Sequence, residues 1–450
     1  DVYKRQMMSY VGRINYGLMD RYLLTASLRY DGSSRLSEGN KWALFPSAAI
    51  AWRITEEDFA KNLDWLSNLK LRFSYGQAGN TNSVSPYASE GTISGSVYYP
   101  FGTSTSVGNL PANIANPMLT WERTSEYNVG LDFGFLNQRI SGNIEYYNRT
   151  TNDLLMKRNI PVHLGYSSVT SNVGSVRNSG FELQLNTANI MTKNFAWNTT
   201  INLAYNKNEI VSLADEEDLS NYSIHLQGMR GSYSDKRFIG KPVDTNWTQN
   251  TIGVWQLGEE EEAAKYGCVP GNFKIKDYNN DGKLTDDDYI IDGKRTPDWT
   301  GGMTNMFKIY DFDFSFHMYF QAGATQYDRF FENFALEWNS QNFNNLRTNY
   351  WTPENPSNTM GRPSQMGSRG NIAYERTDFL KVSYITLGYT LNKRLMSKWG
   401  LDNARIYVTV QNPFILTKFR GLDPEQPDLT NIGDTDGMTM NALLGVNISF

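Results

Sequence analysis

The sequence predicts an all-β chain that forms part of an antiparallel transmembrane β-barrel. Three observations support this fold class: apolar and polar residues alternate along many segments, some segments are long enough to cross a bilayer, and long polar connections alternate with short turns. Because side chains alternate between the two faces of a strand, each such segment has one apolar and one polar face. We count about 14 segments of this kind.

The predicted strands follow one another along the whole chain. In the segment 21–31, for example, Tyr22, Leu24, Ala26, Leu28 and Tyr30 fall on one face. The other strictly alternating segments are 69–75, 127–135, 139–146, 181–186, 197–205, 312–320, 405–411 and 444–450. Weaker alternation predicts further strands at 9–16, 48–53, 236–254, 299–309 and 381–391. Short helical turns are compatible with 56–69 and 259–265, both of which lie between strands.

The connections between these strands differ in length. Tight turns are predicted at 136–139 and at Asp311. The long, polar connections are 79–120, 211–234, 256–298, 326–374 and 417–438. Loops of this length argue against a compact soluble domain, whereas outer-membrane barrels have short periplasmic turns and long extracellular loops. The segments 127–135 and 312–320 also approach the ~9–11 residues that cross a bilayer at a tilt.

Aromatic residues lie near the ends of the apolar faces. Tyr22 and Tyr30 flank one face, and Phe133 and Phe135 precede a turn. Aromatic girdles of this kind mark the membrane interface, although aromatic residues are also good strand formers. A wall with one lipid-facing and one water-facing side explains how 14% aromatic residues are combined with a mean hydropathy of −0.52.

Composition excludes several other classes of protein. The net charge of −5 provides no basic surface for a nucleic-acid partner. A single cysteine, Cys268, excludes a disulfide scaffold and a cysteine-built zinc site. Three scattered histidines argue against a catalytic or zinc triad, and there is no phosphate-binding glycine loop. A pair of carboxylates for glycoside hydrolysis stays open, because the separation of such a pair is spatial. We predict that the chain is not an enzyme. No stretch approaches the ~20 apolar residues of a membrane-spanning helix.

The C-terminus ends in an apolar alternation. Leu444, Val446, Ile448 and Phe450 share one face of the last predicted strand. A terminal aromatic residue with apolar residues at alternate preceding positions is the type of ending that outer-membrane assembly machinery recognises. The alternative is an ordinary last strand, which does not require an aromatic residue at the terminus. We therefore predict a membrane-assembly signal at these four positions.

One polar loop has the spacing of a calcium site. Oxygen ligands at loop positions 1, 3, 5, 7, 9 and 12 suit Ca²⁺, and glycine at position 6 permits the sharp turn. Gly282 takes position 6, and aspartate replaces the usual glutamate at position 12. The predicted ligands are Asp277, Asn279, Asp281, the carbonyl of Lys283, Thr285 and Asp288. The alternative is a polar surface turn that holds no metal.

Aromatic residues in the long connections are candidates for stacking on sugars. The predicted substrate-binding residues are Tyr98, Tyr99, Phe101 and Trp338, with Phe330, Phe331 and Phe334 close to Trp338 in sequence. The alternative, which we favour, is that these rings pack against neighbouring loops or against a partner protein.

Several runs of sequence resemble a known family. They are YLLTASLRYDGSSR (22–35), FPSAAIAWR (45–53), LKLRFSYGQAGN (69–80), NSGFELQL (178–185), the loop 277–288 with TPDWTGG (296–302), and the closing residues 441–450. Together they resemble the SusC/RagA-type TonB-dependent outer-membrane transporters of Bacteroidetes. The resemblance implies that residues 8–450 are the C-terminal part, about 14 of 22 strands, of the barrel. It implies that the plug domain, TonB box and signal peptide are missing, and it leaves 1–7 as an unassigned flank that need not be native.

The resemblance also implies a function and a location. It implies active import of a nutrient, an oligosaccharide in our interpretation, across the outer membrane of a Gram-negative cell. The implied partners are a SusD-like surface lipoprotein, the TonB complex through the missing N-terminal part, and outer-membrane lipid. Two alternatives stay open: a peptide importer of the same family, and a secreted calcium-stabilised β-protein that binds glycans.

Overall fold

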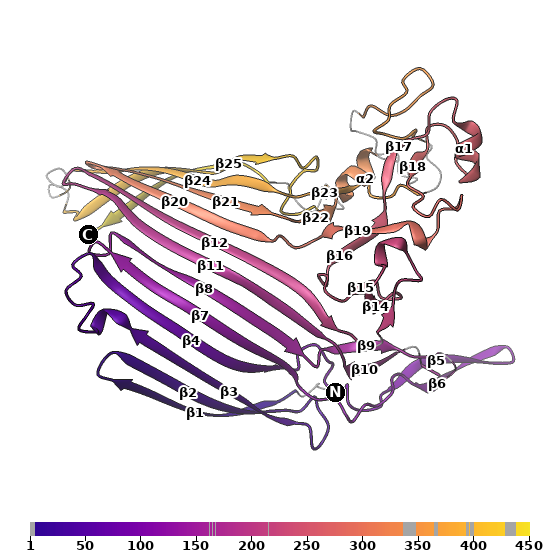
Figure 1. The fold of residues 1–450 in the computed structure, drawn as a ribbon, viewed down its shortest axis with the longest axis horizontal. Helices are drawn as coiled ribbons and strands as arrows, with labels where there is room; N and C mark the ends of the chain where they lie inside the picture. Colours follow the sequence, from indigo (N-terminus) through magenta and orange to yellow (C-terminus); the bar gives the residue numbers. More distant parts are fainter. Residues whose placement is uncertain are drawn as a thin grey trace.

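The computed structural model contains a single large antiparallel sheet that curves into a barrel wall (Figure 1). It describes residues 5–427 and 438–450, except 162, 164, 167, 215, 336–347, 364–367, 393–395 and 397–399. Thirteen strands follow each other in the sheet: β1 (Met7–Leu18), β2 (Tyr22–Ser33), β3 (Trp42–Arg53), β4 (Leu66–Asn80), β7 (Glu122–Phe135), β8 (Ile140–Asn152), β11 (Ser175–Met191), β12 (Phe195–Ser212), β20 (Trp299–Ile309), β21 (Phe312–Ala322), β24 (Phe379–Thr390), β25 (Asn403–Thr417) and β26 (Asn441–Ser449). The wall is open, with β1 and β26 as its edges. None of the described helices is long and apolar enough to cross a membrane.

The strand prediction is confirmed with one correction. Thirteen of the predicted segments form the wall, but 236–254 does not join it. Gly240 has a φ of 79°, and Pro242 has no N–H with which to continue a ladder. The segment breaks into β15 (Arg237–Phe238), β16 (Thr245–Gln249) and β17 (Thr251–Val254), which pair within a connection. The predicted connections 211–234 and 256–298 are therefore parts of one connection, 213–298.

The predicted helical turns have different outcomes. Within 259–265, the structure forms α1 (Glu260–Lys265). The segment 56–69, for which a helical turn was predicted, has no helix beyond Glu56. A single 3₁₀ turn covers Ile54–Glu56, and β4 already begins at Leu66. The mixed apolar spacing of that segment reflects turns that lead into a strand.

Short turns and long connections lie at opposite ends of the wall (Figure 1). At one end, residues 19–21, 136–139, 192–194 and 310–311 join neighbouring strands. Met19, Asp20 and Asn137 adopt positive φ there, which tightens the turns. At the other end, 81–121, 153–174, 213–298, 323–378 and 418–440 form the long connections. The predicted alternation of short and long connections is confirmed.

The long connections carry their own secondary structure. Their further strands are β5 (Ile93–Phe101), β6 (Ser104–Pro111), β9 (Leu155–Asn159), β10 (Ser168–Asn172), β13 (Glu217–Asp218), β14 (Arg230–Ser232), β18 (Phe273–Ile275), β19 (Tyr289–Lys294), β22 (Thr325–Tyr327) and β23 (Tyr374–Arg376). A second helix, α2, spans Arg329–Ala335, and 3₁₀ turns cover Ile224–Leu226 and Asp286–Asp288.

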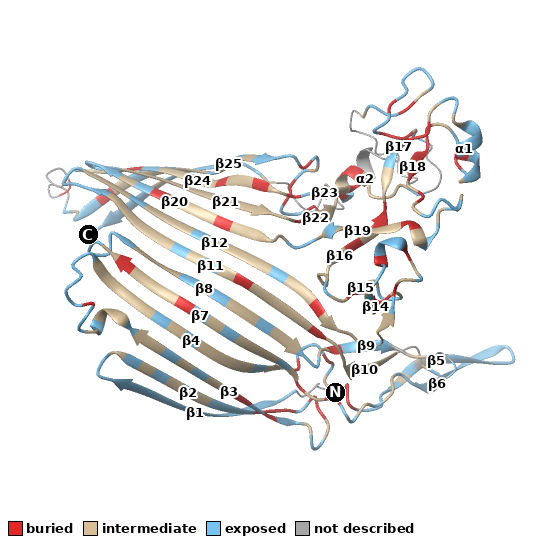
Figure 2. Cartoon of the chain, in the orientation of Figure 1, coloured by how far each residue is buried: buried red, intermediate tan, exposed pale blue. Residues whose placement is uncertain are grey.

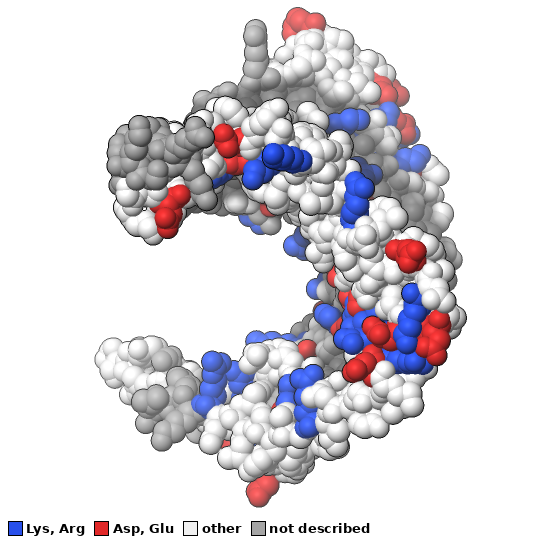
Figure 3. Space-filling model, turned by 90° about the vertical axis from the view of Figure 1, so that its left-hand side faces the viewer, with Lys and Arg blue, Asp and Glu red and all other residues white. Residues whose placement is uncertain are grey.

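Strand register sorts the side chains of the wall into apolar and polar rows. One apolar row runs across six strands through Leu24, Ile50, Phe73, Val129, Tyr146 and Phe181. One polar row runs through Arg13, Ser27, Ser47, Gly76, Glu126, Arg149 and Asn178. All seven residues of the polar row line one hollow. A hollow that spans seven strands lies on the concave face, so the polar side of the wall faces inward and the apolar side faces outward. Figure 3 shows the open, C-shaped wall with charged residues on its concave surface.

Two arginines tie neighbouring strands together on the polar face. Arg72 on β4 lies 2.7 Å from Asp132 on β7 and 2.7 Å from Glu145 on β8. Arg405 on β25 pairs with Asp313 on β21 across β24. In both places a glycine lies under the guanidinium group: a β-carbon at Gly130 would approach Arg72 to 2.9 Å, and one at Gly388 would collide with Arg405.

Most of the buried hydrophobic residues lie in the connections, although one cluster includes Ala43 and Phe45 of the wall strand β3. Figure 2 shows that buried residues gather around α1, α2 and β17, at the long-loop end. The cluster at this place, which we call the loop core, joins the connection 213–298 to 323–378. It contains Val254, Phe273, Phe331, Trp351, Met360 and Ala373. Because the wall is a single layer between two environments, the loops are the part of the chain that encloses a core of its own.

Candidate functional site

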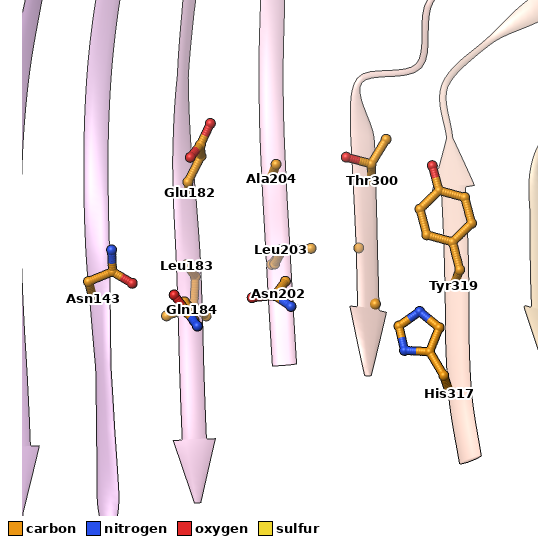
Figure 4. A pocket seen from close by; sticks show the side chains of 12 residues that line it. Asn143, Glu182, Leu183, Gln184, Asn202, Leu203, Ala204, Thr300, His317 and Tyr319 are labelled. Carbon is orange, nitrogen blue, oxygen red and sulfur yellow. The ribbon is translucent and has the colours of Figure 1, made fainter. Parts of the chain in front are cut away.

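A hollow on the concave face collects neutral hydrogen-bonding side chains (Figure 4). Its volume is about 380 Å³. Asn143, Gln184 and Asn202 lie side by side on β8, β11 and β12, because strand register places them in one row. The same row continues through Gly302 to Tyr319 on β21. The row therefore presents carboxamide and hydroxyl groups across five strands.

Histidine and glycine shape the far side of this hollow. His317 lies on β21 beside Tyr319, and its Nδ1 is 2.9 Å from the hydroxyl of Thr304. A β-carbon at Gly302 would lie 3.0 Å from the imidazole, so glycine leaves room for the ring. Thr300 and the carboxylate of Glu182 also line the hollow, together with Leu183, Leu203 and Ala204 (Figure 4). The arrangement can donate and accept hydrogen bonds to a polar ligand.

The hollow contains no group placed for bond cleavage. His317 hydrogen-bonds to a threonine that is not part of a nucleophile–base–acid arrangement. Sequence reasoning placed Gln184 and Asn202 on the polar face of their strands but did not single them out as a site. The signal that was available is the run of carboxamides at alternate positions, Asn143, Gln184, Asn186 and Asn202, on strands that pair in register.

The second hollow, lined by the polar row described above, has a volume of about 810 Å³. Two of its three charged residues form an ion pair, since Arg149 lies 2.6 Å from Glu126, and Arg13 is the third. Ser27 and Ser47 share a hydrogen bond of 2.6 Å nearby. This part of the concave face is therefore polar, with one basic group more than acidic groups among its described lining residues.

The predicted calcium loop forms a tight, internally bonded turn. Asp277 accepts hydrogen bonds from the amides of Asn280 (2.6 Å) and Gly282 (3.0 Å). Asp288 is fully buried and accepts from the amides of Tyr278 (2.8 Å) and Thr285 (2.9 Å). Asn280 and Gly282 adopt positive φ of 56° and 78°, as the sharp turn requires.

The geometry of this loop leaves calcium binding as a prediction. Burial opposes ionisation of Asp277, but hydrogen bonds from the Gly282 amide and the Tyr266 hydroxyl hold its pKa below the ordinary value. Its carboxylate is thus charged near neutral pH, as a cation ligand requires. Asn279, Asp281, Lys283 and Thr285 complete the predicted set and lie on the same loop. Among the described residues, however, no three acidic, histidine or cysteine side chains converge as a metal cluster.

Substitution of Asp281 tests the calcium prediction. Asp281 is exposed and bonds only within the loop, so Asp281→Ala removes a ligand oxygen with little effect on folding. We expect calorimetry on the full-length protein to detect Ca²⁺ binding and the variant to weaken it at least about tenfold, because affinity follows the number of charged ligands. Asp286→Ala removes the same charge at a position that supplies no ligand, and we expect it to bind Ca²⁺ like the wild type. Absence of binding heat in the wild type would contradict the prediction.

The predicted sugar-stacking residues lie in different surroundings. Tyr98, Tyr99 and Phe101 are exposed on the β5–β6 hairpin, which extends away from the wall (Figure 1). Phe331 is buried in the loop core, and the guanidinium of Arg420 lies 4.0 Å above its ring. Trp338 lies outside the described residues. Among the described candidates, the structure therefore places Phe331 apart from the exposed rings of Tyr98, Tyr99 and Phe101, and the preferred alternative of packing within loops holds for Phe331.

The predicted assembly residues form one face of the last strand. Leu444, Val446 and Ile448 lie on β26 opposite Val408, Ile406 and Ala404 of β25. Phe450 follows the strand and is 87% exposed. The residues share one apolar face, as alternation predicts, and their role as an assembly signal stays a prediction.

Comparison with known proteins assigns the chain to a family. The family model described as TonB dependent receptor-like, beta-barrel, matches residues 3–300. The chain belongs to this family. Two relatives, TonB-dependent receptor P26 of Formosa agariphila and TonB-dependent receptor SusC of Bacteroides thetaiotaomicron, are each 34% identical over 99% of the chain. These matches cover 46% and 44% of the relatives, so the chain spans about half of the length of these TonB-dependent receptors.

A solved structure agrees with this assignment. The RagAB peptide importer in its open-open state superposes with a TM-score of 0.79 at 25% identity. That match covers 99% of this chain and 47% of the other. The resemblance to SusC/RagA-type TonB-dependent receptors is therefore confirmed, and with it the partial barrel and the outer-membrane location. The family consists of receptors and transporters, not enzymes.

Proposed function

We propose that this chain forms part of the wall of an importer that carries oligosaccharides across the outer membrane. The observation that carries the proposal is the row of Asn143, Gln184, Asn202 and Tyr319 on the concave face. Carboxamide and phenol groups donate and accept hydrogen bonds without adding charge, which suits a ligand rich in hydroxyl groups. A ligand that lacks hydroxyl groups leaves these side chains without hydrogen-bond partners and therefore binds less tightly. The row thus favours ligands that are rich in hydroxyl groups.

A peptide importer is the second candidate. The RagAB structure that this chain resembles is that of a peptide importer. Peptide backbones also present donors and acceptors that match carboxamides. The alternative of a secreted, calcium-stabilised β-protein is inconsistent with membership of an outer-membrane family.

We also propose the partners of the complete protein. A SusD-like surface lipoprotein would contact the long connections, since these form the extracellular end of an outer-membrane barrel. The TonB complex would act from the periplasmic side, through a part of the protein that precedes this chain. Lipid would contact the apolar outer face. Co-purification of the full-length protein with a surface lipoprotein is the expected result that tests the first of these partners.

Uptake measurements test the proposed substrate class. In cells that carry the full-length protein, we expect Gln184→Ala with Asn202→Ala to lower uptake of a labelled oligosaccharide about thirtyfold, because each of the two lost hydrogen bonds costs about 1 kcal/mol. Asn447→Ala on β26, outside the hollow, is the matched control and should transport normally. If the wild type takes up peptides and not oligosaccharides, the peptide importer is the correct reading. If the double variant transports like the control, the hollow is not on the substrate path.

A further inference from the structure

A cationic pocket lies between the two longest connections, away from the hollows of the wall. Its volume is about 500 Å³, within the range of small-molecule sites. Lys236, Arg237, Arg295 and Arg329 line it, and Asp235 is the one carboxylate among its described lining residues. This local excess of positive charge contrasts with the net charge of −5 of the whole chain.

Strand pairing within the loops builds the pocket from distant parts of the sequence. The connection 213–298 supplies β15, β16 and the segment after β19, and 323–378 supplies β22, the start of α2 and β23. The side-chain amide of Asn246 joins the two connections by donating to the carbonyls of Asp292 (3.1 Å) and Thr325 (2.7 Å). Asn246 is buried and lines the pocket, so these bonds fix the two connections relative to each other where they form it.

Two of the pocket's cations, Arg237 and Arg295, have no carboxylate partner among the described residues, whereas Lys236 has one. Arg237 donates to the carbonyl of Val243, a neutral acceptor. Lys236 lies 3.3 Å above the ring of Tyr233 and 3.7 Å from Asp286, an exposed carboxylate. Arg295 is exposed, and none of the described residues forms an ion pair with it. A guanidinium group without a carboxylate partner is available to an external anion.

Aromatic side chains add flat surfaces next to these cations. Trp247 lines the pocket from β16, and Tyr327 and Tyr374 line it from β22 and β23, with their ring centroids 5.1 Å apart. Aromatic rings together with charged hydrogen-bond donors suit a ligand that has both apolar faces and anionic groups. The described lining of the wall hollows, by contrast, has one carboxylate, Glu182, in the smaller hollow, and Arg13 beside the Arg149–Glu126 pair in the larger one.

We propose that this pocket binds a carboxylate or sulfate group of the imported substrate, and that the transporter therefore prefers anionic substrates. The inference rests on the proposed import function and adds the charge class of the cargo to it. Arginine offers paired N–H donors that match carboxylate and sulfate oxygens. Arg237 lines the pocket from β15, and Arg295 lines it from the segment that follows β19. Acidic oligosaccharides and acidic peptides both carry anionic groups. The binding experiment below therefore compares these two classes of ligand.

Calorimetry on the purified full-length transporter, with its lipoprotein if the two co-purify, tests the pocket. The ligands are a uronate-containing oligosaccharide, a neutral oligosaccharide of equal length, and an acidic and a neutral peptide of equal length. We expect one acidic ligand to bind at least tenfold more tightly than its neutral counterpart, and the difference to shrink as salt is raised. We expect Arg295→Gln to remove about tenfold of that affinity.

The control variant separates a specific site from general charge. Arg376→Gln removes an exposed arginine of β23 that pairs with Asp378 and does not line the pocket. It should leave the affinity for the acidic ligand unchanged. Equal binding of acidic and neutral ligands, or equal effects of the two variants, would overturn the inference.

Two further outcomes distinguish this inference from the proposed function. Normal uptake of a neutral oligosaccharide by both variants, without acidic preference, overturns the charge class and leaves oligosaccharide import intact. Loss of lipoprotein co-purification in Arg295→Gln, with ligand affinity unchanged, shows that the pocket contacts the partner and overturns ligand binding. Absence of any oligosaccharide uptake in the wild type overturns the proposed function, while acidic peptide binding that depends on Arg295 would still support the pocket.

Discussion

Replacement of Ile144 by arginine is expected to destabilise the membrane-inserted barrel by about 2–4 kcal/mol. Ile144 is 46% exposed on the apolar face of β8, where Leu131 and Leu183 lie beside it in register. It is four residues from the short turn at 136–139, which at ~3.4 Å per residue along a tilted strand places it near the middle of the apolar band. A guanidinium group there faces lipid without a partner. The measurement is urea unfolding of the full-length protein in lipid vesicles.

The adjacent residue provides the matched control. Asn143→Arg places the same side chain on the opposite face, where Asp132 is its register partner and Glu145 accepts a hydrogen bond from Asn143 at 2.9 Å. We expect this variant to unfold within about 1 kcal/mol of the wild type, since surface pairs with acids are close to neutral. Equal destabilisation by both variants would contradict the assignment of the lipid-facing side.

Trp351→Ala is expected to release the two longest connections while the wall stays assembled. Trp351 is 5% exposed in the loop core, and its indole N–H donates to Gln256 at 3.0 Å. A β-carbon at Gly271 would collide with the ring, so the tryptophan is packed against the backbone of the other connection. Truncation of a buried tryptophan costs about 3–5 kcal/mol. Hydrogen exchange should show lost protection in 213–298 and 323–378.

Tyr98→Ala is the control for this prediction. Tyr98 is 65% exposed on the β5–β6 hairpin, and its removal should change stability by less than about 0.5 kcal/mol. Retention of the heat-modifiable mobility typical of a folded barrel would show that the wall is intact in both variants. Loss of protection in β20, β21 and β24 of Trp351→Ala would mean that the loop core and the wall unfold together, contrary to expectation.

The strands of the wall were predictable because the pattern that marks each strand lies within its own short stretch of sequence. Each strand pairs with a neighbour in the sheet, and each alternates between a lipid-facing and a water-facing side, so period two appears directly in the sequence. The one error among the predicted strands, 236–254, is a segment in which alternation is weak. Pro242 divides that segment, and a proline inside a predicted central strand was the available warning.

The sites in the loops were not predictable in the same way. The loop core and the cationic pocket join residues that have no periodic relation, such as Val254 with Trp351 or Arg295 with Tyr374. The tryptophans and phenylalanines of the polar connections gave a partial signal, and we interpreted them as sugar-stacking or packing residues without locating the core. The hollow of the wall lay between these cases: alternation placed its residues on the polar face, but register was needed to bring them into one row.

The separation of the loop core from the wall also sets the order in which the chain can fold. The wall can grow strand by strand, because turns as short as 310–311 bring neighbouring strands together. The loop core has high contact order: Thr251 donates to Asn371 across 120 residues, and Val254 donates to Asn358 across 104. Closing such long loops is entropically costly until β20, β21 and β24 have brought their ends together. We therefore expect the loop core to form after these strands of the wall have paired.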